Sequence, residues 1–225
     1  MSETTYTRRS RRFAPLVIAS GIAATLVLGF VTSGALSGFT ASINNTANNI
    51  GSGTLLMTET QGATTCLSSA AGTVTTANAG TCATINKFGG NTTIVPGTSY
   101  TSTVTIQNTG TAPANTFTLT PAGCATTANG AVNGTDSAGF CGKMDITIYD
   151  SSSAKCVAPA AVGACPAIAS TTTLASLGTT PITLTTPLAA GASRSYTFTL
   201  QLDSSATNAD QGLLATEALL WSFAS

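Results

Sequence analysis

Short segments in which apolar and polar residues alternate are the strongest constraint on the fold of this chain. In Tyr100–Gln107 (YTSTVTIQ) and Tyr196–Leu202 (YTFTLQL), aliphatic or aromatic residues occupy alternate positions, and threonines fill most positions between them. This period of two is typical of strands that bury one face and expose the other, as in antiparallel sheets.

Turn signals divide the rest of the chain into more short strands. Pro96-Gly97 and Asn108-Thr-Gly110 are two of these turn signals,. Further strands are expected at Met144–Tyr149 and Thr216–Phe223, and weaker ones at Thr54–Thr58, Thr116–Thr120 and Pro181–Thr185. Only Ser205–Leu213 suggests a turn or two of helix. The sequence predicts an all-β chain, an antiparallel β-sandwich of jelly-roll type, preceded by a cleaved N-terminal signal helix.

The first 37 residues have the layout of a secretory signal peptide. A basic segment containing Arg8, Arg9, Arg11 and Arg12 is followed by an uncharged apolar run and then by small residues,. Cleavage before Gly38 is expected, and the membrane is then involved only before cleavage by signal peptidase. The alternative is a retained anchor, because the apolar run is close to the length that spans a bilayer,. The arginine pairs also raise the twin-arginine export route, but the residues after them fit the general route better.

Charge is scarce and unevenly placed. Charged residues make up 7% of the chain, and from Gly38 onward four basic and seven acidic residues leave a net charge of −3. No basic stripe exists to neutralise phosphates, so no nucleic-acid partner is expected.

The six cysteines are an even set in an exported chain, which favours disulfides,. Sequence alone does not choose among the possible pairings. Their clustering favours sequential neighbours, each pair closing a short loop: Cys66 with Cys82, Cys124 with Cys141, and Cys156 with Cys165. A metal site would require CxxC pairs or histidines, and the sequence contains neither,.

No catalytic, cofactor or metal site is predicted. The chain has no histidine, and Asp145 and Asp150 are expected to be solvated charges that flank a strand,. A Ser-Lys dyad is an alternative, but serine is too common here to support it. A calcium site at Asp203, Asn208 and Asp210 fits no known loop motif, and a polar turn is the simpler interpretation,.

The segment that cleavage would leave at the N-terminus has the pattern of a strand. Phe39, Ala41 and Ile43 alternate with smaller or more polar residues, so that one face is apolar,. An Asn-rich stretch follows at residues 44–49. The expected organisation is therefore a signal peptide at 1–37, an N-terminal strand segment with its linker at 38–50, and a β-sandwich with disulfide-bonded loops at 51–225.

Several short motifs resemble the TasA/camelysin family of secreted β-sandwich proteins that form biofilm-matrix fibres, together with related archaeal bundling pilins. The motifs follow the apolar signal in the family's order: FTASINNTANNIGSGTLLM (39–57), PGTSYTSTVTIQNTG (96–110) and YTFTLQLDSSATNADQGLL (196–214). The cysteines and the low charge depart from the family pattern. The absence of histidine and of an HExxH helix argues against the metalloprotease label given to the camelysin branch,.

The resemblance implies that Phe39, Ala41 and Ile43 form a donor strand that inserts into the next subunit. Strand addition uses backbone hydrogen bonds for affinity and alternate side chains for specificity. Such a head-to-tail contact does not close on itself, so it builds a filament from copies of the same chain.

The sequence supports two hypotheses for the function of the chain. The first is a structural subunit of an extracellular filament, a pilus or biofilm-matrix fibre, secreted to the cell surface and without enzymatic activity. The second is a monomeric secreted or membrane-anchored adhesin that binds a surface or a glycan, with residues 38–43 folded back as the first strand of their own domain. An adhesin more often shows an aromatic-lined patch, and aromatic residues are only 6% here, which favours the filament. A secreted hydrolase is a third, weaker possibility.

Overall fold

The computed structural model describes residues 42–43, 45, 47, 49–69, 73–168 and 172–225. Residues 52–225 form one compact unit, and the residues before them belong to a separate one. The signal segment 1–37 and residues Phe39 and Ala41 lie outside the described residues. No helix in the described ranges is both long and apolar enough to cross a membrane.

Eleven strands and three short helical turns form in the part of the chain that is described. The strands are β1 Met57–Gln61, β2 Thr64–Leu67, β3 Ser99–Asn108, β4 Thr116–Pro121, β5 Ala125–Ala128, β6 Met144–Asp150, β7 Lys155–Ala158, β8 Ile182–Thr183, β9 Ser193–Leu202, β10 Leu213–Thr216 and β11 Leu219–Ala224. The helical turns are η2 Phe140–Lys143, α2 Leu174–Leu177 and η4 Asn208–Asp210. The chain is therefore all-β, as its sequence predicts.

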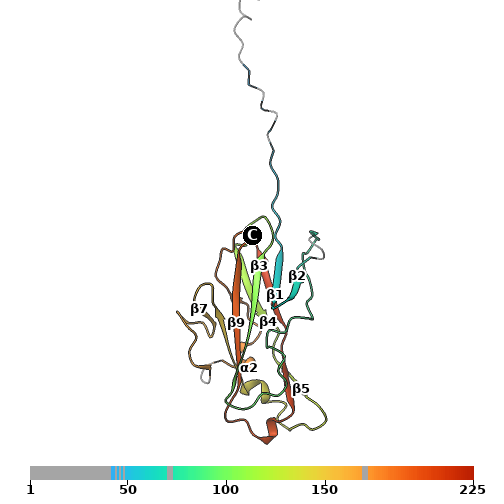
Figure 1. Ribbon diagram of the computed structural model, residues 1–225, viewed down its shortest axis with the longest axis vertical. Helices are drawn as coiled ribbons and strands as arrows, with labels where there is room; N and C mark the ends of the chain where they lie inside the picture. The colour runs from blue at the N-terminus through green and yellow to red at the C-terminus, as the bar shows by residue number, and fades with distance from the viewer. Residues whose placement is uncertain (1–41, 44, 46, 48, 70–72, 169–171) are drawn as a thin grey trace, which may run out of the picture. The chain divides into compact units, whose positions relative to one another are not determined.

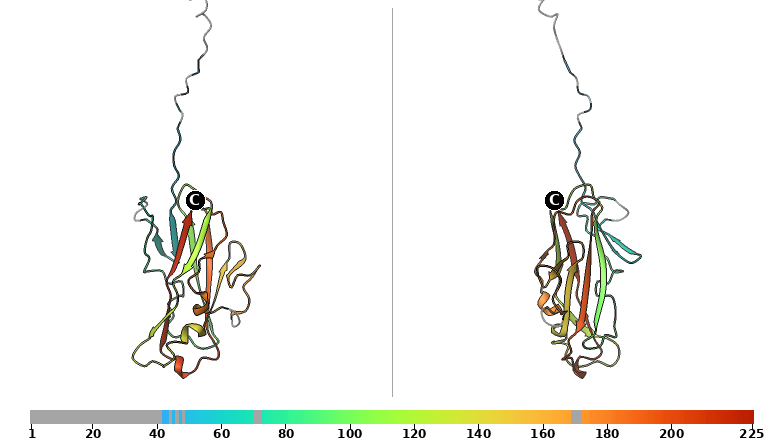
Figure 2. Two further views of the ribbon diagram at one scale, coloured as in Figure 1. Left: turned by 180° about the vertical axis from the view of Figure 1, so that it is seen from behind. Right: turned by 60° about the vertical axis from the view of Figure 1, so that its left-hand side comes forward.

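The strands form one large sheet and two smaller ones. The large sheet has the order β2-β1-β3-β9-β6-β7, and the smaller sheets have the orders β11-β4-β8 and β10-β5. Every pairing between strands is antiparallel. Figures 1 and 2 show the two layers facing one another, with the long strands β3 and β9 central in the larger one.

Aromatic rings fill the space between the layers. Phe117 of β4 meets Tyr196 of β9 edge to face, with ring centroids 5.9 Å apart. Trp221 of β11 lies 5.0 Å from Tyr196 and 6.3 Å from Phe198. Such pairs add to the free energy gained by burying the rings. The packed layers are consistent with the predicted sandwich.

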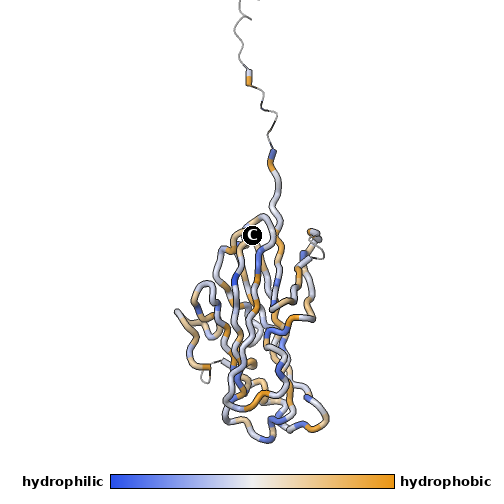
Figure 3. Tube along the Cα trace, viewed as in Figure 1, coloured by the Kyte–Doolittle hydropathy of each residue, from blue (hydrophilic) through white to orange (hydrophobic). Residues whose placement is uncertain are grey.

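The two central strands, β3 and β9, show the alternation of buried and exposed residues that the sequence predicts. Val104 and Ile106 of β3, and Tyr196 and Phe198 of β9, are fully buried, whereas Thr103 lies on the solvent face. Figure 3 shows that hydrophilic and hydrophobic stretches are interspersed throughout the domain. Threonine hydroxyls pair across the outer face, as at Thr103 and Thr197, 3.1 Å apart.

Three of the sequence expectations are corrected by the structure. The first strand covers Met57–Gln61 rather than Thr54–Thr58. The predicted strand Thr216–Phe223 is two strands, with a break at Glu217 and Ala218. Helix around Ser205–Leu213 is limited to the single turn η4.

The six cysteines are joined as sequential neighbours, the pairing that their clustering favours: Cys66–Cys82, Cys124–Cys141 and Cys156–Cys165. The corresponding Cα atoms are 5.8, 6.0 and 4.7 Å apart. Three disulfides indicate folding in an oxidising environment.

Replacing Phe117 by alanine should strongly destabilise the domain. The ring is fully buried and contacts three other aromatic rings, and removal of a buried Phe typically costs about 3–5 kcal/mol. The matched control is Leu220→Ala, because Leu220 is 62% exposed and its loss should change stability by less than about 0.5 kcal/mol. Urea unfolding measures both, and equal effects would contradict the assignment of the core.

Candidate functional site

A groove of about 920 Å³ opens beside the smaller sheets. One wall is residues 80–94, and the other is the run 213–220, which contains β10 and the start of β11. Most of the lining surface is apolar. The side chains at its base and walls include those of Ile85, Phe88, Ile94, Phe140, Met144, Leu174, Leu200, Leu213 and Leu219.

The wall formed by β10 and β11 is an open strand edge. The amide of Ala122 donates to the carbonyl of Ala218, with N and O 2.9 Å apart, so hydrogen-bonded pairs with β4 recur at every second residue. The N–H and C=O groups of Leu219, Trp221 and Phe223 therefore point away from β4. Likewise, Asn129 donates to Gly212, which leaves the backbone groups of Leu213 and Ala215 pointing away from β5.

No neighbouring strand covers this edge. Among the described residues, β11 pairs only with β4, and β10 only with β5. No backbone hydrogen bond in the same ranges joins residues 80–94 to residues 213–223. The two walls of the groove are therefore not joined by backbone hydrogen bonds. A strand placed between them could bond to the free backbone donors and acceptors of the edge.

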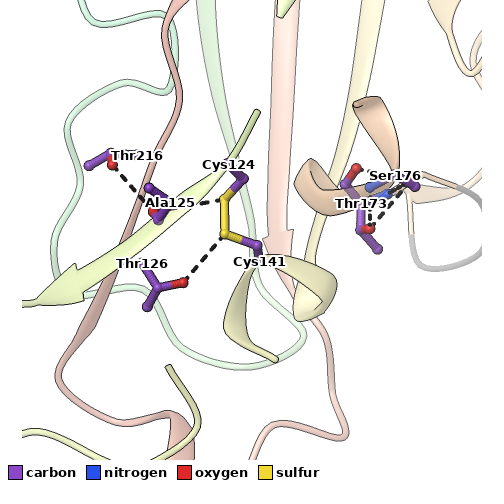
Figure 4. The surroundings of a disulfide bond; sticks show 7 residues. All are labelled: Cys124, Ala125, Thr126, Cys141, Thr173, Ser176 and Thr216. Carbon is purple, nitrogen blue, oxygen red and sulfur yellow. Dashed lines mark hydrogen bonds between the residues drawn. A yellow bond between two sulfur atoms is a disulfide. The ribbon is translucent and has the colours of Figure 1, made fainter. Parts of the chain in front are cut away.

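Disulfides anchor both sides of the groove. Cys66–Cys82 ties the start of residues 80–94 to β2. Cys124–Cys141, shown in Figure 4, ties the link between β4 and β5 to η2. Thr216 of β10 donates from its hydroxyl to the carbonyl of Ala125, as Figure 4 also shows. The sequence suggested surface loops held by disulfides, but these loops border the groove.

Helix α2 supports the base of the groove through its cap. Thr173 and Ser176 bond to each other's backbone amides in a reciprocal capping box, drawn in Figure 4. This cap satisfies amides at the start of a very short helix. It holds Leu174, which is fully buried and lines the groove.

Glu217 is the unusual residue of the groove lining. It lies in the break between β10 and β11, and both of its carboxylate oxygens are buried without a hydrogen-bond partner. Burial raises its pKa to about 7, and the nearby backbone amide of Gly123 offsets this only in part. A buried carboxylate without a partner is costly, so such a group suggests a missing ligand.

The other charges near the groove are already paired. Lys87 lines the groove but lies 2.9 Å from Glu59, whose Oε1 also accepts a hydrogen bond from the Trp221 indole. Glu217 is thus the one carboxylate of the groove lining without a counter-charge among the described residues.

Of the proposed donor residues, only Ile43 is among the described residues. Phe39 and Ala41 lie outside the described residues, and Ile43 is 99% exposed. Ile43 therefore packs against nothing in the described part of the chain.

Two aspartates expected to be solvated are buried instead. Asp150 is fully buried, 3.3 Å from Arg194, and it accepts hydrogen bonds from the turn at Ser152 and Ser153. Asp145 is 5% exposed, and burial raises its pKa, with the negative charge of Asp203 adding a smaller effect. Both lie on β6, which has buried residues on both faces and against which α2 packs.

The candidate calcium residues form polar turns. Asp203 accepts a hydrogen bond from the amide of Ser205, and Asp210 caps η4 through Thr207 while it pairs with Lys143 at 2.9 Å. Within the described ranges, no group of three or more His, Cys, Asp or Glu residues could hold a metal ion.

Comparison with known proteins gives no match: no family model fits the chain, and no curated protein matches it. The function must therefore be argued from the groove and the sequence.

Sequence reasoning did not identify the groove or Glu217. One signal was available, since Glu217 is the single charged residue in the otherwise apolar and small run 213–221 (LLATEALLW). The position of residues 80–94 opposite this run gave no local signal.

Glu217→Gln should stabilise the chain at high pH but not at low pH. The folded state raises the pKa of Glu217 from 4.5 to about 7, so it holds a proton that the unfolded chain releases, and stability falls as the pH rises through this window. Gln cannot ionise, so the variant should melt roughly 2–4 °C higher at pH 8, which corresponds to about 1 kcal/mol for a domain of this size.

The measurement is thermal unfolding of chains that begin at Asn44, so that no donor segment competes. At pH 4 the two chains should melt together. A constant difference across the whole pH range would show that Glu217 is not the titrating group.

Proposed function

We propose that the protein is the structural subunit of an extracellular filament that polymerises by strand donation. The segment 38–43 of one copy occupies the groove of the next and pairs with the edge of β10 and β11. The single observation that carries this proposal is an apolar groove bordered by strands whose outward backbone groups have no partner.

The groove and the segment are matched in chemistry and length. The groove lining is mainly apolar and lies along the eight residues 213–220. The segment has six residues, no charged side chain, and Phe39, Ala41 and Ile43 on one face. A six-residue strand extends over about 20 Å, which is shorter than the edge available to it. Backbone pairing would supply affinity, and the alternate side chains would enter the groove.

The full exposure of Ile43 also supports donation. An apolar side chain that is exposed in the described part of the chain is available to another copy. A contact between a segment on one copy and a groove on the next is heterologous, so it continues into a filament rather than closing a dimer.

The proposal also includes the fold type, the signal cleavage, the family and the location of the protein. The sandwich is of jelly-roll type, residues 1–37 are a signal that signal peptidase removes, and the chain belongs with the TasA/camelysin fibre proteins. The filament lies outside the cell, carries out no catalysis, and involves no nucleic acid. The three disulfides support the extracellular location,.

The alternative is the monomeric adhesin. The groove volume is also within the range of small-molecule sites,, so a ligand such as a glycan could occupy it. The strand edge favours the filament, because unused backbone groups spaced along a strand suit a second strand better than a compact ligand.

The test is negative-stain electron microscopy of the chain that begins at Gly38. Filaments are expected from this chain, and only monomers from the same chain without residues 38–43. Folded monomers from both would contradict self-polymerisation and favour the adhesin, or a filament that needs a second subunit.

A matched pair of variants tests which face of the segment is used. Phe39→Asp with Ile43→Asp places two charges on the apolar face and should abolish filaments, because charges are not tolerated in an apolar groove. Thr40→Asp with Ser42→Asp places two charges on the other face and should retain them. Equal loss in both variants would contradict the proposed insertion.

A further inference from the structure

The segment that enters the groove carries a single charge. After cleavage before Gly38, residues 38–50 contain no Asp, Glu, Lys or Arg, so the only charged group is the α-ammonium of the new N-terminus. Its ordinary pKa of about 7.7–8.0 keeps it largely protonated at neutral pH.

The groove offers one charge without a counter-charge. Both carboxylate oxygens of Glu217 are buried with no hydrogen-bond partner, and the other carboxylate near the groove, Glu59, is held by Lys87 and Trp221. Lys87, Tyr100 and Glu217 are the titratable side chains of the lining. An occupant that brings a positive charge with hydrogen-bond donors would satisfy Glu217, and an uncharged strand would bury it further.

We infer that Glu217 binds the free α-ammonium of the strand donated by a second copy. This inference rests on the proposed strand donation and adds its recognition element. An ammonium has three donors and no acceptor, which suits a carboxylate that has no side-chain partner. A charge-assisted hydrogen bond is stronger than one between neutral groups.

The position of Glu217 allows this pairing. It lies in the break between β10 and β11, within the open edge rather than at its end. A six-residue strand whose first residue lies beside Glu217 can extend along the six-residue strand β11, whereas in the other direction it would pass the end of the four-residue strand β10 at Leu213. Only one residue of a strand is its terminus, so the ion pair fixes the register that backbone pairing alone leaves free.

Signal cleavage acquires a chemical role from this pairing. In the uncut chain the nitrogen of Gly38 is a neutral amide inside a peptide bond, and an apolar segment lies upstream of it. The precursor therefore lacks the group that Glu217 binds. Cleavage creates the ammonium, so assembly is confined to chains that have already been exported and cut.

Peptide binding tests the pairing separately from polymerisation. The acceptor is the chain from Gly38 with Phe39→Asp and Ile43→Asp, which keeps its groove but donates poorly. The probes are two peptides of residues 38–49, one with a free N-terminus and one acetylated, each with a fluorophore at its C-terminal end. Fluorescence anisotropy near neutral pH gives both dissociation constants.

The acceptor with Glu217 should bind the free-amine peptide about tenfold more tightly than the acetylated peptide, the size expected for a buried charge-assisted bond. In a second acceptor with Glu217→Gln this preference should disappear. In a third with Asp203→Asn it should persist, because Asp203 is not part of the groove lining. This comparison is a double-mutant cycle, so it removes general effects of each change.

The two proposals fail in different ways. Equal binding of both peptides by the Glu217 acceptor would overturn the ammonium pairing and leave strand donation intact. A preference for the free amine that survives Glu217→Gln would also overturn it. Binding of neither peptide by any acceptor would overturn strand donation itself.

Discussion

The proposed pairing between copies depends on the incomplete hydrogen-bond ladder along β10 and β11. Soluble proteins usually protect such an edge by covering it or by placing charges on it, because an open edge invites pairing with another chain. Here the edge borders an apolar groove, and its opposite wall, residues 80–94, forms no backbone hydrogen bond to residues 213–223 among the described residues. In the proposed filament this open edge is the element for assembly, and assembly is controlled by when a partner strand becomes available.

The disulfides and the capped α2 explain how the groove is maintained. A gap between two walls tends to collapse so that its apolar lining is buried. Cys66–Cys82 and Cys124–Cys141 fix elements on its two sides, and the cap at Thr173 holds Leu174 at its base. The two glutamates show the same division of roles, since Glu59 binds Lys87 and Trp221 within the structure, whereas the carboxylate oxygens of Glu217 are buried without a side-chain partner.

The sequence predicted those parts of the fold in which one strand face is buried and the other solvated. Alternation identified β3 and β9, and clustering favoured the cysteine pairing that the structure contains. Strands β2, β5 and β7 were missed because each has only four residues, which is too short to show a clear period. The burial of Asp145 was missed because it depends on α2, a distant segment that packs on β6. The groove was missed for the same reason, since its walls are more than a hundred residues apart in sequence.

Amide hydrogen exchange along β10 and β11 is the most direct test of the central claim, which is that this edge receives a strand from another copy. It compares monomers that lack residues 38–43 with assembled chains that begin at Gly38. The account predicts fast exchange in the monomer at Leu213, Ala215, Leu219, Trp221 and Phe223, and strong protection after assembly of the consecutive amides in this set that a six-residue strand can span. Unchanged exchange at these residues in an assembled fibre would contradict it, because the subunits would then be joined through another surface.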